Sequence, residues 1–203
     1  MCIRDSDTAM IIAKERLQLA EKLKDEELVN QGVMNVADVM NKMGKHENAL
    51  IMLGRVKRTE SVKKDTYFYY LYHTIYLSCY NEAIDDAGKR LAWQKIRAYK
   101  DTLIAISEPQ SSSYITNKCG RLSMSGQWDE AIRLLEDYYN QSTEDNPDRA
   151  RMEYLLAELY LGKQDTLRAR HYLILSSLTD IANAKKVYMS LQRLAILLFQ
   201  EGD

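Results

Sequence analysis

Proline and glycine are scarce in this sequence, with two prolines and eight glycines among 203 residues. A protein built only of β-strands needs many turns, and turns draw heavily on these two residues. The scarcity therefore argues against an all-β fold. Hydrophobic residues make up 46% of the chain and charged residues 28%, which is ordinary for a soluble domain that buries a core.

Cysteine is also rare. Cys2, Cys79 and Cys119 lie far apart and lack the spacing of metal ligands. An odd number of cysteines argues against a complete disulfide framework. We therefore expect ordinary thiols and no metal site, and the redox compartment cannot be inferred.

Positively and negatively charged residues are nearly balanced in number, and the sequence has no long apolar run. The formal net charge is −1, which excludes a global attraction to nucleic acid or to anionic membranes. No run approaches the roughly 18 apolar residues of a transmembrane helix, and no apolar signal sequence follows Met1. We expect no direct nucleic-acid binding and no membrane contact by this segment.

Signatures of catalysis are missing as well. The sequence has no glycine-rich phosphate loop and no His-Glu-x-x-His, Cys-x-x-Cys or Gly-x-Ser-x-Gly motif. The three histidines, His46, His73 and His171, lie within helical patterns that already explain them. The acidic pairs Asp85-Asp86 and Asp129-Glu130 stand at expected helix starts, where they complement the helix dipole. We expect no enzymatic activity and no cofactor.

A ten-residue cassette beginning at Gly126 is the clearest pattern that is present. Gly126 can end a helix in the left-handed conformation, and Trp128 is a large apolar residue at the start of the next helix. Ala131 is small where two helices must approach, and Leu134 and Leu135 continue an apolar face at helical spacing. The cassette predicts the turn and second helix of a helix-turn-helix repeat.

The cassette recurs along the chain. Gly44 begins a close copy, Gln164 begins a weaker one, and a helix containing Ala9 resembles the second half of another. The aligned alanines Ala9, Ala49, Ala131 and Ala169 are separated by 40, 82 and 38 residues. Because 82 is twice 41, one divergent repeat lies between Ala49 and Ala131. Recurrence at this period is typical of stacked helix pairs.

The predicted fold is all-α: a right-handed superhelical solenoid of antiparallel helix pairs. We expect roughly ten helices, the count read from the helical periodicity. The first carries Ile12, Leu19, Ala20 and Leu23 on its apolar side, and an unpaired helix over about 182–199 leaves an apolar face open. Expected breaks lie near Lys24-Asp25, Gly44, Arg58-Ser61, Glu82-Asp85, Pro109, Gly126, Asn146 and Gly162.

One repeat domain is expected over residues 7–203, truncated in mid-repeat at its C-terminal end. Residues 1–6 do not fit the repeat pattern, and we interpret them as a non-native start. The basic residues between 55 and 64 are interrupted by Glu60 and lack interleaved aromatic side chains, so we expect a solvated loop rather than a nucleic-acid site.

Tyrosine is concentrated between residues 67 and 80, which hold six of the fourteen tyrosines. Tyr69, Tyr72, Tyr76 and Tyr80 fall on one stripe of a predicted helix. Two interpretations remain open. The stripe packs between helices, or it lines a groove, where tyrosine supplies contact area with a polar tip. His73, in the same segment, is expected to be a packed histidine rather than a catalyst.

The cassettes resemble the tetratricopeptide repeat, although their spacing is nearer 40 than the family's usual 34 or so residues. The segments 172–181 and 191–203 are similar to the sensor region of membrane-anchored bacterial transcriptional regulators. That resemblance implies a fragment of a signalling protein in which a periplasmic repeat array precedes a transmembrane helix and a cytoplasmic regulatory part.

We hypothesise a non-catalytic domain that binds a protein or peptide partner in a concave groove formed by the first helices of the pairs. The alternative is a purely structural or dimerisation array, and the unpaired last helix leaves a homodimer open. Met34 and Asp38 replace the Lys/Asn pattern of carboxylate-clamp co-chaperones, which argues against that use. The groove candidates are Asp38, Asn41, Tyr69, Tyr72, Tyr76, Arg151, Tyr154 and Glu158.

If Ala131 lies where two helices touch, Ala131→Leu overpacks that contact and should cost about 1–3 kcal/mol of stability. Denaturant unfolding of the wild type and the variant measures this cost. An unchanged unfolding midpoint in Ala131→Leu would show that the alanine is not at a close contact.

Overall fold

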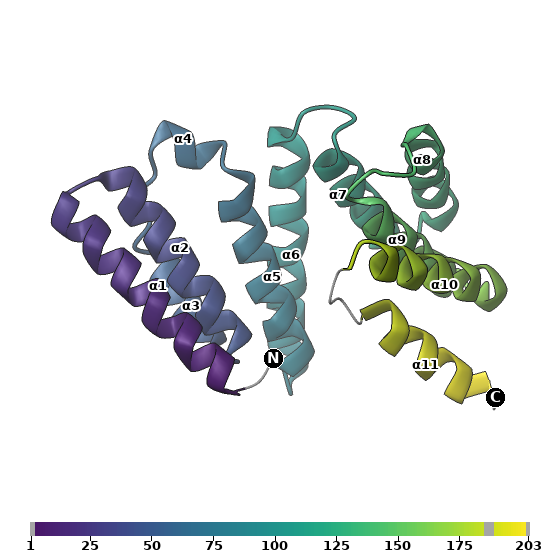
Figure 1. Cartoon of the computed structure of the whole chain (residues 1–203), viewed down its shortest axis with the longest axis horizontal. Coiled ribbons are helices and arrows are strands. Elements are labelled where there is room, and N and C mark those ends of the chain that lie inside the picture. The colour runs from purple at the N-terminus through teal and green to yellow at the C-terminus, as the bar shows by residue number, and fades with distance from the viewer. Residues whose placement is uncertain (1–2, 185–188, 202–203) are drawn as a thin grey trace. The chain divides into compact units, whose positions relative to one another are not determined.

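The computed structural model describes residues 3–184 and 189–201. The described residues form eleven α-helices and no strand (Figure 1). In these parts of the chain, every helix is too short or too polar to cross a membrane. The helices are α1 (Ile3–Leu23), α2 (Glu26–Lys42), α3 (His46–Leu53), α4 (Glu60–Lys63), α5 (Thr66–Glu82), α6 (Asp86–Ile106), α7 (Ser112–Ser123), α8 (Trp128–Gln141), α9 (Arg149–Gly162), α10 (Thr166–Ala182) and α11 (Met189–Glu201).

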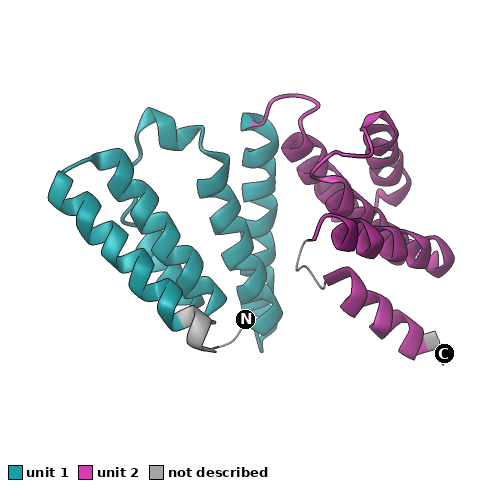
Figure 2. Cartoon of the chain, in the orientation of Figure 1, with its two compact units in different colours: residues 1–106 teal, residues 107–203 magenta. Residues whose placement is uncertain are grey.

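The chain divides into two compact units, residues 1–106 and residues 107–203 (Figure 2). In unit 1, α2 packs on α3 and α5 packs on α6. In unit 2, α7 packs on α8 and α9 packs on α10. We call α2, α5, α7 and α9 first helices, and α3, α6, α8 and α10 second helices. First helices of successive pairs also touch, α2 with α5 and α7 with α9, so the expected all-α stack of helix pairs is confirmed within each unit.

Three of the four turns between paired helices contain a residue in the left-handed conformation, the exception being the turn between α5 and α6. Gly44 and Gly126 both take the left-handed conformation, with φ of 74° and 75°, as the cassette predicts for Gly126. After Gly126, the amide of Gln127 donates to the carbonyl of Leu122 at 3.1 Å, which satisfies a carbonyl at the end of α7. Gln164 takes the same conformation in the weaker copy, with φ of 65°.

Three of the four aligned alanines are fully buried. Ala49, Ala131 and Ala169 have no exposed surface, and the Cys119 thiol of α7 lies 3.4 Å from the Ala131 carbonyl oxygen of α8. Ala9 departs from this pattern and remains partly exposed on α1, a helix that packs mainly on α2. Ala13 is the buried alanine of that helix.

Of the four residues predicted above for the apolar side of α1, only Ala20 is buried, together with Ala13 and Leu17 of the cassette that contains Ala9. The structure buries Ala13, Leu17 and Ala20, and it leaves Ile12, Leu19 and Leu23 exposed. Gly32 of α2 explains the choice of face, because a Cβ at that position would come within 3.0 Å of the Leu17 Cα. Because Gly32 has no side chain, the backbone of α1 can approach this part of α2 closely.

Several boundaries differ from the expected ones. Helix α1 begins at Ile3, within the segment interpreted as a non-native start, and the expected loop at 55–64 contains the short helix α4. After the expected break at Asn146, Pro147 precedes α9, whose N-cap is Asp148. The expected helix over 182–199 falls partly on residues 185–188, which lie outside the described residues. Its described part, α11, leaves Phe199 largely exposed, as expected for an unpaired helix.

Trp128 packs against α9 at Gly162. A Cβ added at Gly162 would lie 2.3–2.8 Å from three carbons of the Trp128 ring, so the ring occupies the space where a side chain would stand. The next residue, Lys163, forms an ion pair with Asp129, the neighbour of Trp128. The cassette tryptophan therefore joins one helix pair of unit 2 to the next.

Gly162→Ala should destabilise the protein by about 1–3 kcal/mol, because the new methyl group displaces the Trp128 ring. Gly88→Ala is the matched control. Its Cβ would meet neighbours at 3.4 Å or more, so the better helix propensity of alanine should stabilise α6 by roughly 0.4–1 kcal/mol. Denaturant unfolding of both variants checks the pair, and equal effects would contradict the proposed Trp128–Gly162 packing.

Candidate binding site

The three tyrosines proposed for the groove in unit 1 gather around a fourth. The rings of Tyr72 and Tyr76 stack on Tyr99 of α6, with centroids 4.9 and 5.9 Å away, and Tyr69 lies 6.4 Å from it. Phe68 meets Tyr69 and Tyr72 edge-on. All three stripe tyrosines are half-buried. The tyrosine layer thus packs one side against α6 and leaves part of each ring accessible.

Burial governs the ionisation of these hydroxyls. It raises the pKa of Tyr72 and Tyr76, and it raises the pKa of Tyr99 to about 12. The groups are therefore neutral hydroxyls at physiological pH, able both to donate and to accept hydrogen bonds. The layer offers aromatic surface with neutral polar tips.

Asp38 and Asn41 lie on α2 in the same unit. Asp38 is partly exposed and pairs with Lys42 at 2.6 Å. Asn41 already has a partner within the fold, because its Oδ1 lies 2.6 Å from Nδ1 of His46. The Nε2 atom of His46 in turn lies 2.9 Å from Glu82. This chain of contacts links α2, α3 and α5, so Asn41 positions helices and Asp38 is the more accessible of the two.

Arg151, Tyr154 and Glu158 follow one another along α9 in unit 2. Arg151 is exposed and forms no ion pair with another residue that the structure describes. Glu158 accepts a hydrogen bond from Arg193 of α11 at 2.8 Å. Burial and the nearby Glu158 carboxylate raise the pKa of Tyr154. The structure therefore gathers the predicted residues into two sets, one in each unit.

Unit 2 contains a polar network that the sequence analysis missed. Glu153 is 2% exposed and accepts hydrogen bonds from Tyr139 at 2.9 Å and from Thr179 at 2.8 Å, while Arg149 approaches it to 3.4 Å. These groups come from α8, α9 and α10, so no periodicity within one helix could reveal the network. With its partners in place, Glu153 is satisfied and holds three helices together.

A second such cluster centres on Glu136 of α8. It accepts hydrogen bonds from Tyr160 at 2.6 Å and from Tyr172 at 3.5 Å, and the two tyrosine rings stack 5.7 Å apart. Burial, followed by the hydrogen bond to Glu136, raises the pKa of Tyr160 to about 12. This cluster also joins α8, α9 and α10, and its groups are committed to the fold.

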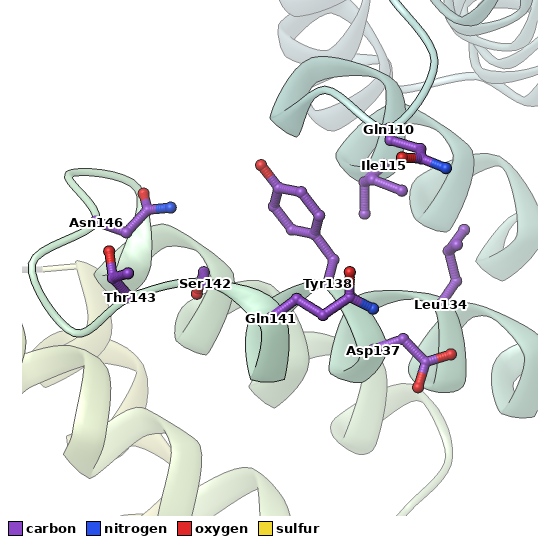
Figure 3. Close-up of a pocket in the computed structure, with 9 residues that line it drawn as sticks. All are labelled: Gln110, Ile115, Leu134, Asp137, Tyr138, Gln141, Ser142, Thr143 and Asn146. Atoms are coloured by element: carbon purple, nitrogen blue, oxygen red, sulfur yellow. The ribbon is translucent and has the colours of Figure 1, made fainter.

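The larger of two notable cavities in unit 2 has a volume of about 570 Å³. Figure 3 shows its side chains projecting from α8, from the start of α7 and from the loop after α8. Amide and hydroxyl groups surround a single tyrosine ring there, a lining suited to a small polar group. The lining residues are Gln110, Ile115, Leu134, Asp137, Tyr138, Gln141, Ser142, Thr143 and Asn146.

The smaller cavity, of about 300 Å³, lies among α9, α10 and the start of α11. Arg151 and Tyr154, two of the predicted residues, contribute to its wall. The described residues contain no group of three or more His, Cys, Asp or Glu side chains arranged to hold a metal ion.

The comparisons with known proteins identify the family. The family model described as the SusR N-terminal TPR domain matches residues 5–203, nearly the whole chain. The chain belongs to this family. The tetratricopeptide resemblance of the cassettes is therefore confirmed.

A solved structure shares the fold of this TPR domain. It is a thermophilic TPR protein from Thermus thermophilus, with a TM-score of 0.62 and 15% sequence identity, and the match covers 92% of this chain and 99% of that one. No curated protein matches the sequence. Tetratricopeptide arrays are protein-interaction scaffolds that use extended surfaces, and the fold is typically non-catalytic.

The ionisation of His73 in this TPR domain is strongly displaced by its surroundings. Burial, and then the charge of Lys100 on α6, lower the pKa of His73 to about 3, and its Nδ1 is buried without a hydrogen-bond partner. The side chain is thus a neutral, packed imidazole at pH 7, as the sequence analysis expected.

His73 should make folding sensitive to mild acid. The unfolded histidine binds a proton near pH 6.5 and the native one only near pH 3, so the stability that His73 confers is present above 6.5 and lost as the pH falls. Between pH 7 and pH 5 the wild type should lose about 2 kcal/mol more than His73→Leu. Denaturant unfolding at the two pH values measures this, and equal losses would mean that His73 titrates normally in the native state.

Proposed function

We propose that this TPR domain is the sensor part of a bacterial regulatory protein and binds an extended protein or peptide segment along its first helices. The family match over residues 5–203 carries the proposal, because that family is named for the N-terminal domain of SusR. A regulator's N-terminal repeat array needs a ligand-binding surface rather than a catalytic centre. A membrane-anchored parent with a periplasmic array is part of the same proposal.

In unit 1 the proposed surface is the tyrosine layer on α5. The exposed parts of Tyr69, Tyr72 and Tyr76 combine apolar area with hydroxyl groups, the composition that protein interfaces favour. Stacking on Tyr99 fixes the rings in advance, so little side-chain freedom is lost on binding. Asp38 supplies a partly exposed carboxylate on the neighbouring α2.

In unit 2 the proposed surface is α9, with Arg151 as its polar anchor. Arg151 is exposed and suited to a bidentate contact with a ligand carboxylate. Glu158 already pairs with Arg193 at 2.8 Å, so a ligand would have to exchange that contact to use it. Tyr154 lies between the two charges on the helix and adds aromatic surface.

A structural or dimerisation array is the second candidate. The stacking of Tyr72 and Tyr76 on Tyr99 favours it, because part of the tyrosine layer is occupied by the fold itself. The exposed apolar side chains of α1 and α11, among them Leu19 and Phe199, would suit contact with another copy.

The interaction proposal can be tested with a random linear peptide library selected against the immobilised chain. Selected peptides should lose about tenfold or more in affinity when Tyr72 is changed to alanine, the usual cost of truncating an interface anchor. Tyr70→Ala is the matched control, because Tyr70 lies on the same helix outside the stripe and is exposed. Isothermal titration gives the affinities, and circular dichroism checks that helicity is kept.

Arg151→Ala and Arg133→Ala form a second matched pair for the same peptides. Both arginines are exposed, but Arg151 lies on a first helix and Arg133 on a second helix. If binding survives both Arg151→Ala and the triple alanine variant of Tyr69, Tyr72 and Tyr76, the first-helix surface is not the site and the structural array is the better account.

A further inference from the structure

The smaller cavity of unit 2 contains a buried carboxylate without a partner. Asp180 of α10 is 6% exposed and lines the cavity of about 300 Å³. No hydrogen bond or ion pair joins it to another described residue. Most buried charges in proteins are paired, because an isolated one is costly to remove from water. A cavity beside such a group indicates that something else can supply the partner.

Two buried serines complete the polar side of the cavity, and their hydrogen bonds fix the positions of their protons. Ser176 Oγ lies 2.8 Å from the Ala150 carbonyl oxygen and 2.6 Å from Ser190 Oγ. A hydroxyl has one proton, and the carbonyl can only accept, so Ser176 donates to Ala150. Ser190 must then donate to Ser176, which leaves the lone pairs of Ser190 Oγ to accept.

Among the buried side chains of the described residues that line the cavity, the groups left without a hydrogen bond are therefore acceptors: the Asp180 carboxylate and the lone pairs of Ser190 Oγ. The remaining wall includes the apolar side chains of Pro147, Ala150 and Met189, together with Tyr154. An aromatic face attracts a cation. This lining is complementary to a ligand with an apolar body and a cationic group that donates several hydrogen bonds.

The other charges that line the cavity are Asp148 and Arg151. Asp148 is partly exposed and adds a second carboxylate, whereas Arg151 is exposed, so water screens its charge more strongly than that of Asp180. Among the described residues, the lining thus contains two carboxyl groups and one guanidinium, and the buried one of the three is the Asp180 carboxyl group.

We propose that this cavity binds the primary ammonium group of a small amine with an apolar body, with Asp180 as its counter-charge. An ammonium group has three donors and matches the two acceptors found here. Its hydrogen bond to a carboxylate is charge-assisted and strengthened by burial. The volume is at the lower end of that of small-molecule sites, which favours a compact ligand. The proposal does not rest on the peptide-binding role, because it needs no contact with the first-helix surface beyond the cavity.

The test uses 2-phenylethylamine and its uncharged analogue 2-phenylethanol on the full chain at neutral pH. The amine should bind in isothermal titration, and the alcohol about tenfold or more weakly, because it cannot form the charged contact. Asp180→Asn keeps the shape of the side chain and removes its charge, so it should weaken the amine by a similar factor and leave the alcohol unchanged. Asp137→Asn, at the other cavity of the same unit, is the matched control and should change neither.

Three outcomes would overturn the proposal: no binding of the amine, equal binding of the amine and the alcohol, or full affinity for the amine in Asp180→Asn. If Asp180→Asn does not fold, Ser190→Ala takes its place, and unchanged amine affinity in that variant would also overturn the proposal. Because the probes contain no peptide bond, a negative result here leaves the peptide-library experiment to decide the interaction role separately.

Discussion

The close approach of helices at small residues is the constraint on which each unit depends. Ala49, Ala131 and Ala169 are fully buried on second helices, and Gly32 and Gly162 stand where a side chain of the neighbouring helix takes the space of a Cβ. Helix pairs can stack only if their backbones come close enough for the larger side chains to interlock around these points. The apolar clusters of both units are built around such contacts.

The polar groups of unit 2 add specificity to this apolar packing. Glu153 and Glu136 are each held by tyrosine hydroxyls from other helices, and these hydrogen bonds are directional where apolar contacts are not. A helix that slipped along its neighbour would leave the buried Glu153 unpaired, at a large cost. Asp180 in the same unit is also buried, but it forms no hydrogen bond or ion pair with another residue that the structure describes. The hydrogen-bonded carboxylates maintain the fold, whereas Asp180 is the one assigned to a ligand in the proposal above.

The candidate surfaces follow from the same architecture. In a stack of helix pairs the first helices present successive faces, and the side chains that are not needed for packing remain accessible. Tyr72 and Tyr76 contribute both to packing and to the accessible surface, because stacking on Tyr99 orders their rings while leaving part of each exposed. Arg151 contributes only to the accessible surface. Glu158, in contrast, is paired with Arg193, and Asn41 contacts His46.

The sequence by itself determined the long helices other than their exact ends, and the turns at Gly44 and Gly126, because helical periodicity and left-handed glycines are local properties that each segment carries alone. The recurrence of the cassette determined the repeat family. It also indicated that Ala131 is buried, as are Ala49 and Ala169, whereas Ala9 at the aligned position is partly exposed. Which face of α1 is buried was decided only by the tertiary structure, because both faces of that helix are apolar and Gly32 of α2 selects one. The Glu153 network and the Asp180 cavity likewise depend on side chains from three helices, whose meeting is set by packing and leaves no mark within any one segment.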